Sequence, residues 1–157
     1  MKIHVGDTAE FSKLISEAEV NGFAELTGDH NPIHLDEDYA RGTRFGRRIA
    51  HGMLTASLIS SVIANKLPGE GAVYLSQTLQ FVAPVFLDDT VTARVTVLQI
   101  REEKPIVTLE TICVNQRGET LLRGEATVLI PTERSWKAAA KVSHMSTNAS
   151  AQISAVS

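Results

Sequence analysis

The longest run of apolar side chains, at residues 52–67, leaves almost no polar face when it is placed on a helix. A helix that is apolar nearly all round is a buried helix, because each of its faces needs an apolar neighbour. Pro68 and Gly69 follow the run and end the helical pattern. The pattern therefore predicts one long helix at the centre of the molecule.

Downstream of this helix the periodicity changes to that of β-strands. Four segments are rich in Val, Thr, Leu and Ile, namely residues 72–82, 90–101, 105–115 and 120–130. In the second segment the apolar residues alternate with polar ones, so that one face is buried and the other is wetter; the apolar set is Val91, Ala93, Val95 and Val97. Short turns between consecutive strands predict an antiparallel meander.

Upstream of the central helix, the pattern predicts a short strand at 7–14 and then a helix. Ser16 and the glutamate three residues later have the spacing of a capping box, and Gly28 is a suitable helix stop. Residues 29–50 show little periodicity and are expected to form a long ordered loop, with a short helix considered for 36–41. Long loops inside compact domains are usually functional, so this loop is the first candidate for a site.

The predicted elements belong to one domain. Neither a lone helix nor a sheet can bury its apolar face by itself, so the sheet is expected to wrap around the helix. We therefore expect an α+β fold over residues 1–132. Residues 133–157 are rich in Ala, Ser and Thr with few large apolar groups, and are expected to be a loosely ordered tail; a short helix is considered for 136–142.

The charge of the chain indicates which classes of partner it is expected to bind. The formal net charge is −3, which argues against a nucleic-acid-binding surface. Arg44, Arg47 and Arg48 form the one local basic cluster of note. Such a cluster is either a solvated face or a phosphate site, and the spacing alone favours the solvated face because unbonded surface cations are common.

The cysteine count and the hydropathy of the chain bear on its compartment. Cys113 is the only cysteine, which excludes an internal disulfide, and its apolar neighbours favour the role of a small buried hydrophobe. Residues 1–7 lack the apolar core of a signal peptide, and the apolar run at 53–67 is too short and too interrupted for a membrane span. A cytoplasmic protein without membrane contact is expected.

Asp29 and His34 are the candidate acid–base residues of the long loop. Five residues of regular helix would separate them by about 140°, and Pro32 favours an extended residue before it, so the two side chains can meet only across a turn. A carboxylate beside an imidazole supplies a general base and a general acid near neutral pH. The alternative is structural: Asp29 in a turn or helix cap, and His34 as a satisfied internal histidine.

Gly52 opens the central helix and is the candidate donor to an oxyanion. The N-terminus of a helix presents unpaired N–H groups and a partial positive charge. A glycine leaves the approach to its own N–H open to a ligand. The alternative is that Gly52 only allows the helix to pack closely.

These residues belong to motifs that resemble the MaoC-like, (R)-specific enoyl-CoA hydratases. The resemblance covers about residues 4–131, and the motifs are Asp29-His30-Asn31-Pro32-Ile33-His34, Phe45-Gly46, Ile49-Ala50-His51-Gly52-Met53-Leu54, Gln80-Phe81-Val82-Ala83-Pro84-Val85 and Gly124-Glu125-Ala126. The resemblance implies the hot-dog fold, a long central helix wrapped by an antiparallel sheet. Arg48 departs from the family, in which this position often holds proline or threonine, and this departure concerns only the approach to the site.

The resemblance also implies a reaction, the reversible hydration of trans-2-enoyl-CoA to (R)-3-hydroxyacyl-CoA. Asp29 and His34 would then hold one water, remove its proton and return a proton to C2 of the substrate. Gly52 N–H would polarise the thioester carbonyl, Asn31 would shape the loop, and Ser60 would be a supporting residue near the site.

The same resemblance implies the partners. The substrate is an acyl-CoA or acyl-carrier-protein thioester, and neither a metal nor another cofactor is needed. A homodimer is implied, because hot-dog proteins usually pair their sheets edge to edge and pairing closes an exposed edge.

Three alternatives stay open at the level of the sequence. An acyl-CoA thioesterase of the same fold needs a carboxylate but has no need of the aspartate–histidine pair. A non-catalytic acyl-CoA-binding module has no need of Asp29 or His34 and can add a DNA-binding helix pair, whereas both residues are present and no such extension is expected. A dehydratase subunit that works only with a partner chain is the third.

Overall fold

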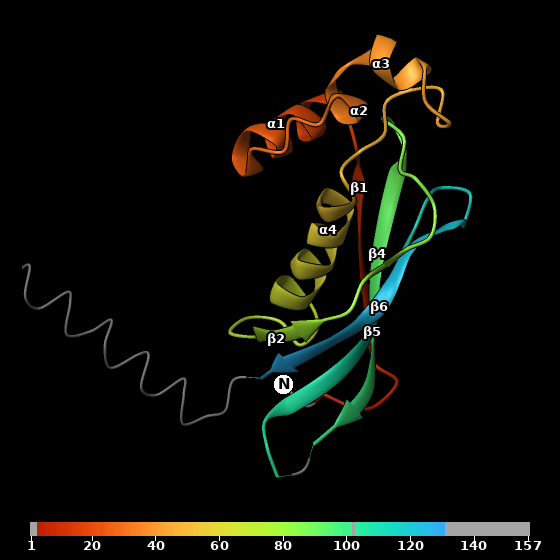
Figure 1. Ribbon diagram of the computed structural model, residues 1–157. Coiled ribbons are helices and arrows are strands. Elements are labelled where there is room, and N and C mark those ends of the chain that lie inside the picture. Colours follow the sequence, from red (N-terminus) through yellow and green to blue (C-terminus); the bar gives the residue numbers. More distant parts are fainter. Residues whose placement is uncertain (1–2, 102, 131–157) are drawn as a thin grey trace, which may run out of the picture.

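The computed structural model describes residues 3–101 and 103–130 and shows an antiparallel sheet curved around one long helix (Figure 1). The strands follow the order β1-β4-β5-β6-β2, and the short β3 also pairs with β6. Their bounds are β1 Thr8–Leu14, β2 Val73–Gln77, β3 Gln80–Phe81, β4 Thr90–Ile100, β5 Ile106–Val114 and β6 Thr120–Leu129. All the pairings are antiparallel, so the predicted meander is confirmed for β4, β5 and β6.

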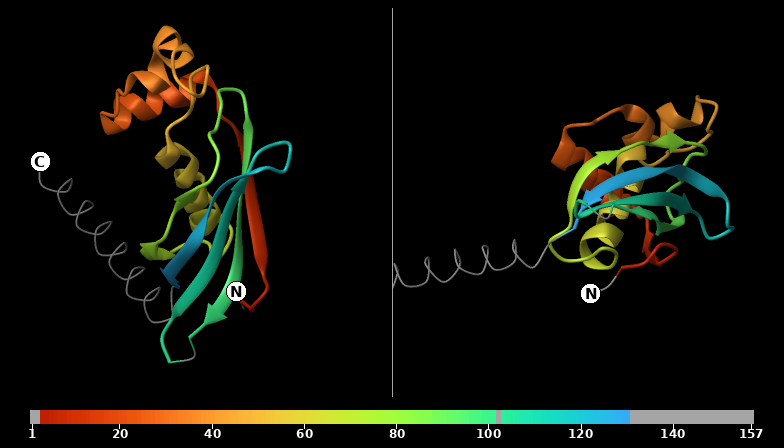
Figure 2. Two further views of the ribbon diagram at one scale, coloured as in Figure 1. Left: turned by 45° about the vertical axis from the view of Figure 1, so that its right-hand side comes forward. Right: turned by 90° about the horizontal axis from the view of Figure 1, so that it is seen from below.

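Helix α4, Gly52–Asn65, is the predicted central helix, and it ends two residues before the predicted end at residue 67. It lies against one face of the sheet and contacts β1, β4 and β5 (Figure 2). Its apolar residues Leu58, Ile59, Val62 and Ile63 are almost completely buried. The helix and the inner face of the sheet therefore form one common core.

The alternation predicted for β4 is confirmed. Val91, Ala93, Val95 and Val97 are all at most 1% exposed. Cys113 on β5 is also fully buried, and burial raises the pKa of its thiol to about 12. The prediction that this cysteine acts as a small buried hydrophobe therefore agrees with its place in the core.

The segment 72–82 differs from the single strand that the sequence predicts. It is divided into β2 and β3 at Thr78 and Leu79, where the chain passes close to Gly124 of β6. Thr78 N–H donates to Glu125 O at 2.9 Å, and the Thr78 hydroxyl accepts a hydrogen bond of 2.9 Å from Glu125 N–H. A Cβ on residue 124 would lie 1.8 Å from the carbonyl oxygen of Thr78, so only glycine permits this crossing.

Three helices lie together beyond the N-terminal end of α4 (Figure 1). Helix α1, Glu17–Thr27, begins with the predicted capping box at Ser16 and ends at Gly28, whose positive φ of 77° suits a glycine. Helix α3, Glu37–Arg41, confirms the short helix considered for 36–41. Helix α2, Pro32–Leu35, was not predicted, because four residues are too few to show a helical period.

The predicted tail at 133–157 and its considered helix lie outside the described residues, so the domain boundary at 132 stays a prediction. In the described part of the chain, no helix is both long and apolar enough to cross a membrane.

We expect Gly124→Ala to lower the free energy of unfolding by about 2 kcal/mol or more, because the new methyl group must displace backbone rather than a flexible side chain. Urea denaturation followed by circular dichroism measures the change. Gly22→Ala is the matched control: apart from the backbone of its own helix, nothing lies within 4 Å of the added methyl group, and alanine at this exposed helix position should raise stability by up to about 1 kcal/mol. Equal stability of Gly124→Ala and the parent protein would contradict the tight crossing.

Candidate active site

The turn after α1 is built by side chains that accept hydrogen bonds from the backbone. Asp29 Oδ1 accepts from Asn31 N–H at 3.3 Å, and Asn31 Oδ1 accepts from Ile33 N–H at 3.3 Å. Asn31 is thereby the N-cap of α2, and Pro32 takes the first helical position, where its missing N–H costs nothing. The sequence proposed a loop-shaping role for Asn31, and this geometry supports it.

His34 comes from α2 and is only 9% exposed. Its Nδ1 lies 2.8 Å from the carbonyl oxygen of Ile49. A carbonyl only accepts, so Nδ1 carries the proton and Nε2 keeps a free lone pair. Burial lowers the pKa of His34 below its ordinary value, and His51 lowers it further, against the opposing effects of the Ile49 carbonyl and Asp29. Neutral His34 thus offers a base at Nε2.

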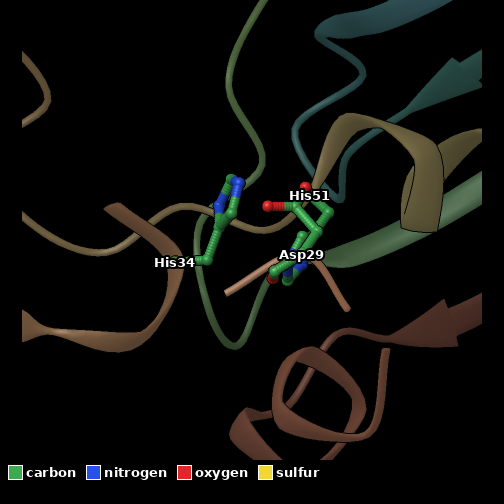
Figure 3. A group of neighbouring side chains, drawn as sticks. All are labelled: Asp29, His34 and His51. Carbon is green, nitrogen blue, oxygen red and sulfur yellow. The ribbon is translucent and has the colours of Figure 1, made fainter. Parts of the chain in front are cut away.

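Asp29, His34 and His51 converge at the N-terminal end of α4 (Figure 3). One ligand-type atom from each lies within 4.8 Å of the other two. Asp29 is exposed, whereas both histidines are buried. The convergence that the sequence required across a turn is therefore present, and the turn is the one that Gly28 and Pro32 create.

His51 is a member of the cluster to which the sequence assigned no role. Its Nε2 lies 2.9 Å from the carbonyl oxygen of Asp29, and its ring centroid lies 3.9 Å from that of His34 with 32° between the planes. Its presence in the His-Gly motif was the only available signal, and periodicity could not reveal a contact across 22 residues.

The same three side chains could be considered for a metal ion. One nitrogen of each histidine donates to a backbone carbonyl, and each neutral ring keeps one free lone pair. The two rings are tilted by 32° to each other. These residue types suit proton transfer, and the same types also occur in metal sites.

A cavity of about 250 Å³ lies beside the cluster. Most of its wall is apolar; the lining residues are His34, Arg44, Phe45, Ile49, Ala50, Gly52, Thr55, Phe81, Val82, Ala83, Pro84, Val85 and Leu121. His34 and Gly52 therefore face a common space. Ser60 does not belong to this wall and is exposed on α4, about 12 Å along the helix from Gly52.

Gly52 and Thr55 form the part of the wall contributed by α4. As the first residue of the helix, Gly52 has no intrahelical partner for its N–H. A Cβ on Gly52 would lie 2.8 Å from the ring of Phe81, so a glycine allows this aromatic side chain to pack against the helix start. Thr55 is 2% exposed and its hydroxyl has no hydrogen-bond partner among the described residues, a feature that the sequence did not reveal.

The three clustered arginines have different surroundings. Arg48 Nε donates to His34 O at 2.6 Å, and its guanidinium also pairs with Glu17 and Asn21 of α1. Arg44 and Arg47 are exposed and lie over the rings of Phe45 and Phe86. Arg48 therefore links the loop to α1 by hydrogen bonds. Of these three arginines, only Arg44 and Arg47 have guanidinium groups directed to the surface.

Known proteins match this chain over most of its length. A family model for the MaoC like domain matches residues 3–116. The chain belongs to the MaoC-like family. Among curated members, it is 50% identical over 129 residues to the (R)-specific enoyl-CoA hydratase of Rhodospirillum rubrum, covering 82% of this chain and 89% of that protein. The 3-hydroxybutyryl-CoA dehydratase of Methylorubrum extorquens is also 50% identical over 129 residues, covering 82% of each chain.

Solved structures of MaoC-like proteins agree with the fold described above. The (R)-hydratase from A. caviae involved in PHA biosynthesis matches with a TM-score of 0.80 and 49% identity, covering 82% of this chain and 98% of that chain. The expected hot-dog fold is thereby confirmed.

We expect His34 to titrate with a pKa below the ordinary histidine value of about 6.5, because protonation would place a charge in a buried site. Titration of the ¹⁵N-labelled histidine rings by NMR measures this value, and His34→Gln identifies the signal among the five histidines. The neutral form should be the Nδ1–H tautomer. A pKa at or above the ordinary value would contradict the burial of this ring.

Proposed function

We propose that this chain is an (R)-specific enoyl-CoA hydratase, a hydro-lyase that adds water reversibly to trans-2-enoyl-CoA. The observation that carries the proposal is the convergence of Asp29 and His34 beside a cavity whose wall includes Gly52 at the start of α4. The MaoC-like relatives named above support the same reaction class.

Asp29 and neutral His34 act on a single water molecule in this proposal. The water donates hydrogen bonds to the Asp29 carboxylate and to Nε2 of His34, and it loses a proton as its oxygen attacks C3 of the enoyl thioester. The π electrons of the double bond move toward the carbonyl and form an enolate. A proton from the pair then reaches C2, so that one water is added in total and the two residues return to their initial state.

The enolate oxygen needs a donor, and we assign this role to Gly52. Its N–H lies at the positive end of α4, where the helix dipole favours a developing negative charge. The apolar wall of the cavity excludes water and strengthens this interaction. Losing one such donor costs on the order of 3 kcal/mol in comparable sites.

The other predicted site residues have indirect roles. Asn31 shapes the turn through its cap on α2 and does not react. Ser60 keeps the supporting role that the resemblance implies, although it lies outside the wall of the cavity in the single chain.

We also propose that two copies pair through the β2 edge of the sheet. Strand β2 lies at one end of the strand order, and this region exposes Val73, Leu75, Phe81 and Val82, each about half exposed. Exposed apolar side chains on an edge strand favour pairing with another chain. Phe81 and Val82 also line the cavity, so such a dimer would complete its wall.

Further parts of the proposal follow from the reaction. The acyl group is carried by CoA or by an acyl-carrier protein, and the residues already named supply all the proton transfers without a metal or other cofactor. We also propose that the protein is cytoplasmic, as the sequence predicts.

We expect the purified chain to hydrate crotonyl-CoA, measured as loss of the conjugated enoyl-thioester absorbance. Asp29→Asn and His34→Ala should each lower kcat by at least about 10²-fold, because a positioned acid or base contributes roughly 10²–10⁴. Asp38→Asn and His4→Ala are matched controls, since both side chains are exposed and outside the cluster.

The competing functions give different results in the same assay. Release of free CoA thiol from an acyl-CoA would indicate a thioesterase, and inactivity of the purified chain would favour a binding module or a partner-dependent subunit. Unchanged rates in both site variants would refute the acid–base assignment. An (R)-specific 3-hydroxyacyl-CoA dehydrogenase tests the configuration of the product separately.

We expect Leu75→Glu to shift the protein from dimer to monomer, because it places a charge within the exposed apolar edge. Light scattering coupled to size-exclusion chromatography gives the mass of the particle. Leu26→Glu is the control, since Leu26 is 83% exposed on α1 and outside this edge. Pairing through β2 would be contradicted if the parent protein is a monomer, or if the Leu75→Glu variant remains a dimer.

A further inference from the structure

We propose that His51 is a positioning residue for the hydration step, which holds the main chain of Asp29 and the ring of His34 in one arrangement. The inference rests on the proposed function, because it assigns the two residues that His51 holds to the chemistry. His51 is 2% exposed and its Nε2 is bonded to the Asp29 carbonyl, so it acts through its neighbours and not on the substrate.

The first contact of His51 fixes the turn that carries Asp29. Nε2 lies 2.9 Å from the Asp29 carbonyl oxygen, and since a carbonyl only accepts, Nε2 carries the proton. His51 is 2% exposed, so water competes little for this bond. The bond joins the residue before α4 to the residue after the C-cap of α1, and thereby ties an exposed carboxylate to the buried helix start.

The second contact supports the ring of His34. The two imidazole rings are 3.9 Å apart at their centroids and inclined by 32°, and the ring of Phe23 lies 5.1 Å from His51. His34 is also held at Nδ1 by Ile49 O. With one nitrogen bonded and one face covered, the direction of its Nε2 lone pair has little freedom.

The remaining nitrogen of His51 makes the two contacts separable by mutation. Nδ1 has no hydrogen-bond partner among the described residues, so a replacement need not reproduce it. The amide of glutamine can donate from the position of Nε2, whereas phenylalanine keeps a flat ring and loses the donor. His51→Phe thus removes the bond to Asp29 and keeps a ring beside His34, whereas His51→Gln keeps a donor to Asp29 and removes the ring.

The experiment compares kcat and KM of His51→Gln, His51→Phe and His51→Ala in the crotonyl-CoA assay, with thermal unfolding of each variant as a control for folding. We expect kcat per folded enzyme to fall by about 10 to 10²-fold in His51→Phe, and further in His51→Ala, because small displacements of reacting groups are this costly. His51→Gln should recover much of the loss. KM should stay within about twofold of the parent value, since His51 does not contact the substrate.

Several outcomes would overturn the proposal. If kcat per folded enzyme is unchanged in His51→Phe and His51→Ala, His51 does not position the pair. If KM rises while kcat is unchanged, His51 acts in substrate binding. If glutamine is no better than alanine, the hydrogen bond to Asp29 does not carry the effect.

Histidine-ring NMR gives a readout that does not depend on activity. In the parent protein the ring signals should show His51 as the Nε2–H tautomer, and His51→Ala, which removes the ring beside His34, should move the ring signals of His34. If both NMR results are observed but crotonyl-CoA is not hydrated, the proposed function is wrong and the contacts of His51 are confirmed. If the parent hydrates crotonyl-CoA but the His34 signals do not respond, the positioning role fails and the proposed function stands.

Discussion

The burial of α4 against the curved sheet is the constraint on which the rest of the structure depends. The helix packs on β1, β4 and β5 through side chains that are almost fully buried. Sliding or tilting the helix would open voids in a close-packed core, which costs several kcal/mol for a large side chain. The start of α4 therefore has a fixed position, and residues that form hydrogen bonds to it are held in place.

Hydrogen bonds to main-chain carbonyls transfer this rigidity to the loop. His34 donates to Ile49 O, Arg48 donates to His34 O, and His51 donates to Asp29 O. Ala50 N–H also donates to Val85 O at 2.8 Å, which anchors the segment before α4 to the segment before β4. These hydrogen bonds fix a loop without regular periodicity to the core, and most of them come from polar side chains.

The sequence predicted the parts of this structure that depend on local pattern. The alternation in β4 and the capping box at Ser16 each follow from neighbouring residues, and both are confirmed. The position of α4 is also confirmed, but its predicted burial on all sides is wrong, because Met53, Ser60 and Ala64 are exposed on one face. The break between β2 and β3 and the contacts of His51 are set by residues far apart in the chain, such as Gly124 and Asp29. No period or propensity encodes such contacts, so the sequence could name the Asp29 and His34 pair but not what holds it.

Asp29 and His34 differ in burial, and this difference suits the two proton-transfer roles that we propose for them. Burying a carboxylate and an imidazole together would require the desolvation of a charge, which is costly unless the charge is paired. Here only the imidazole is buried, and burial favours its neutral form. The exposed carboxylate keeps contact with water. A neutral imidazole and an exposed carboxylate thus lie side by side without an uncompensated buried charge.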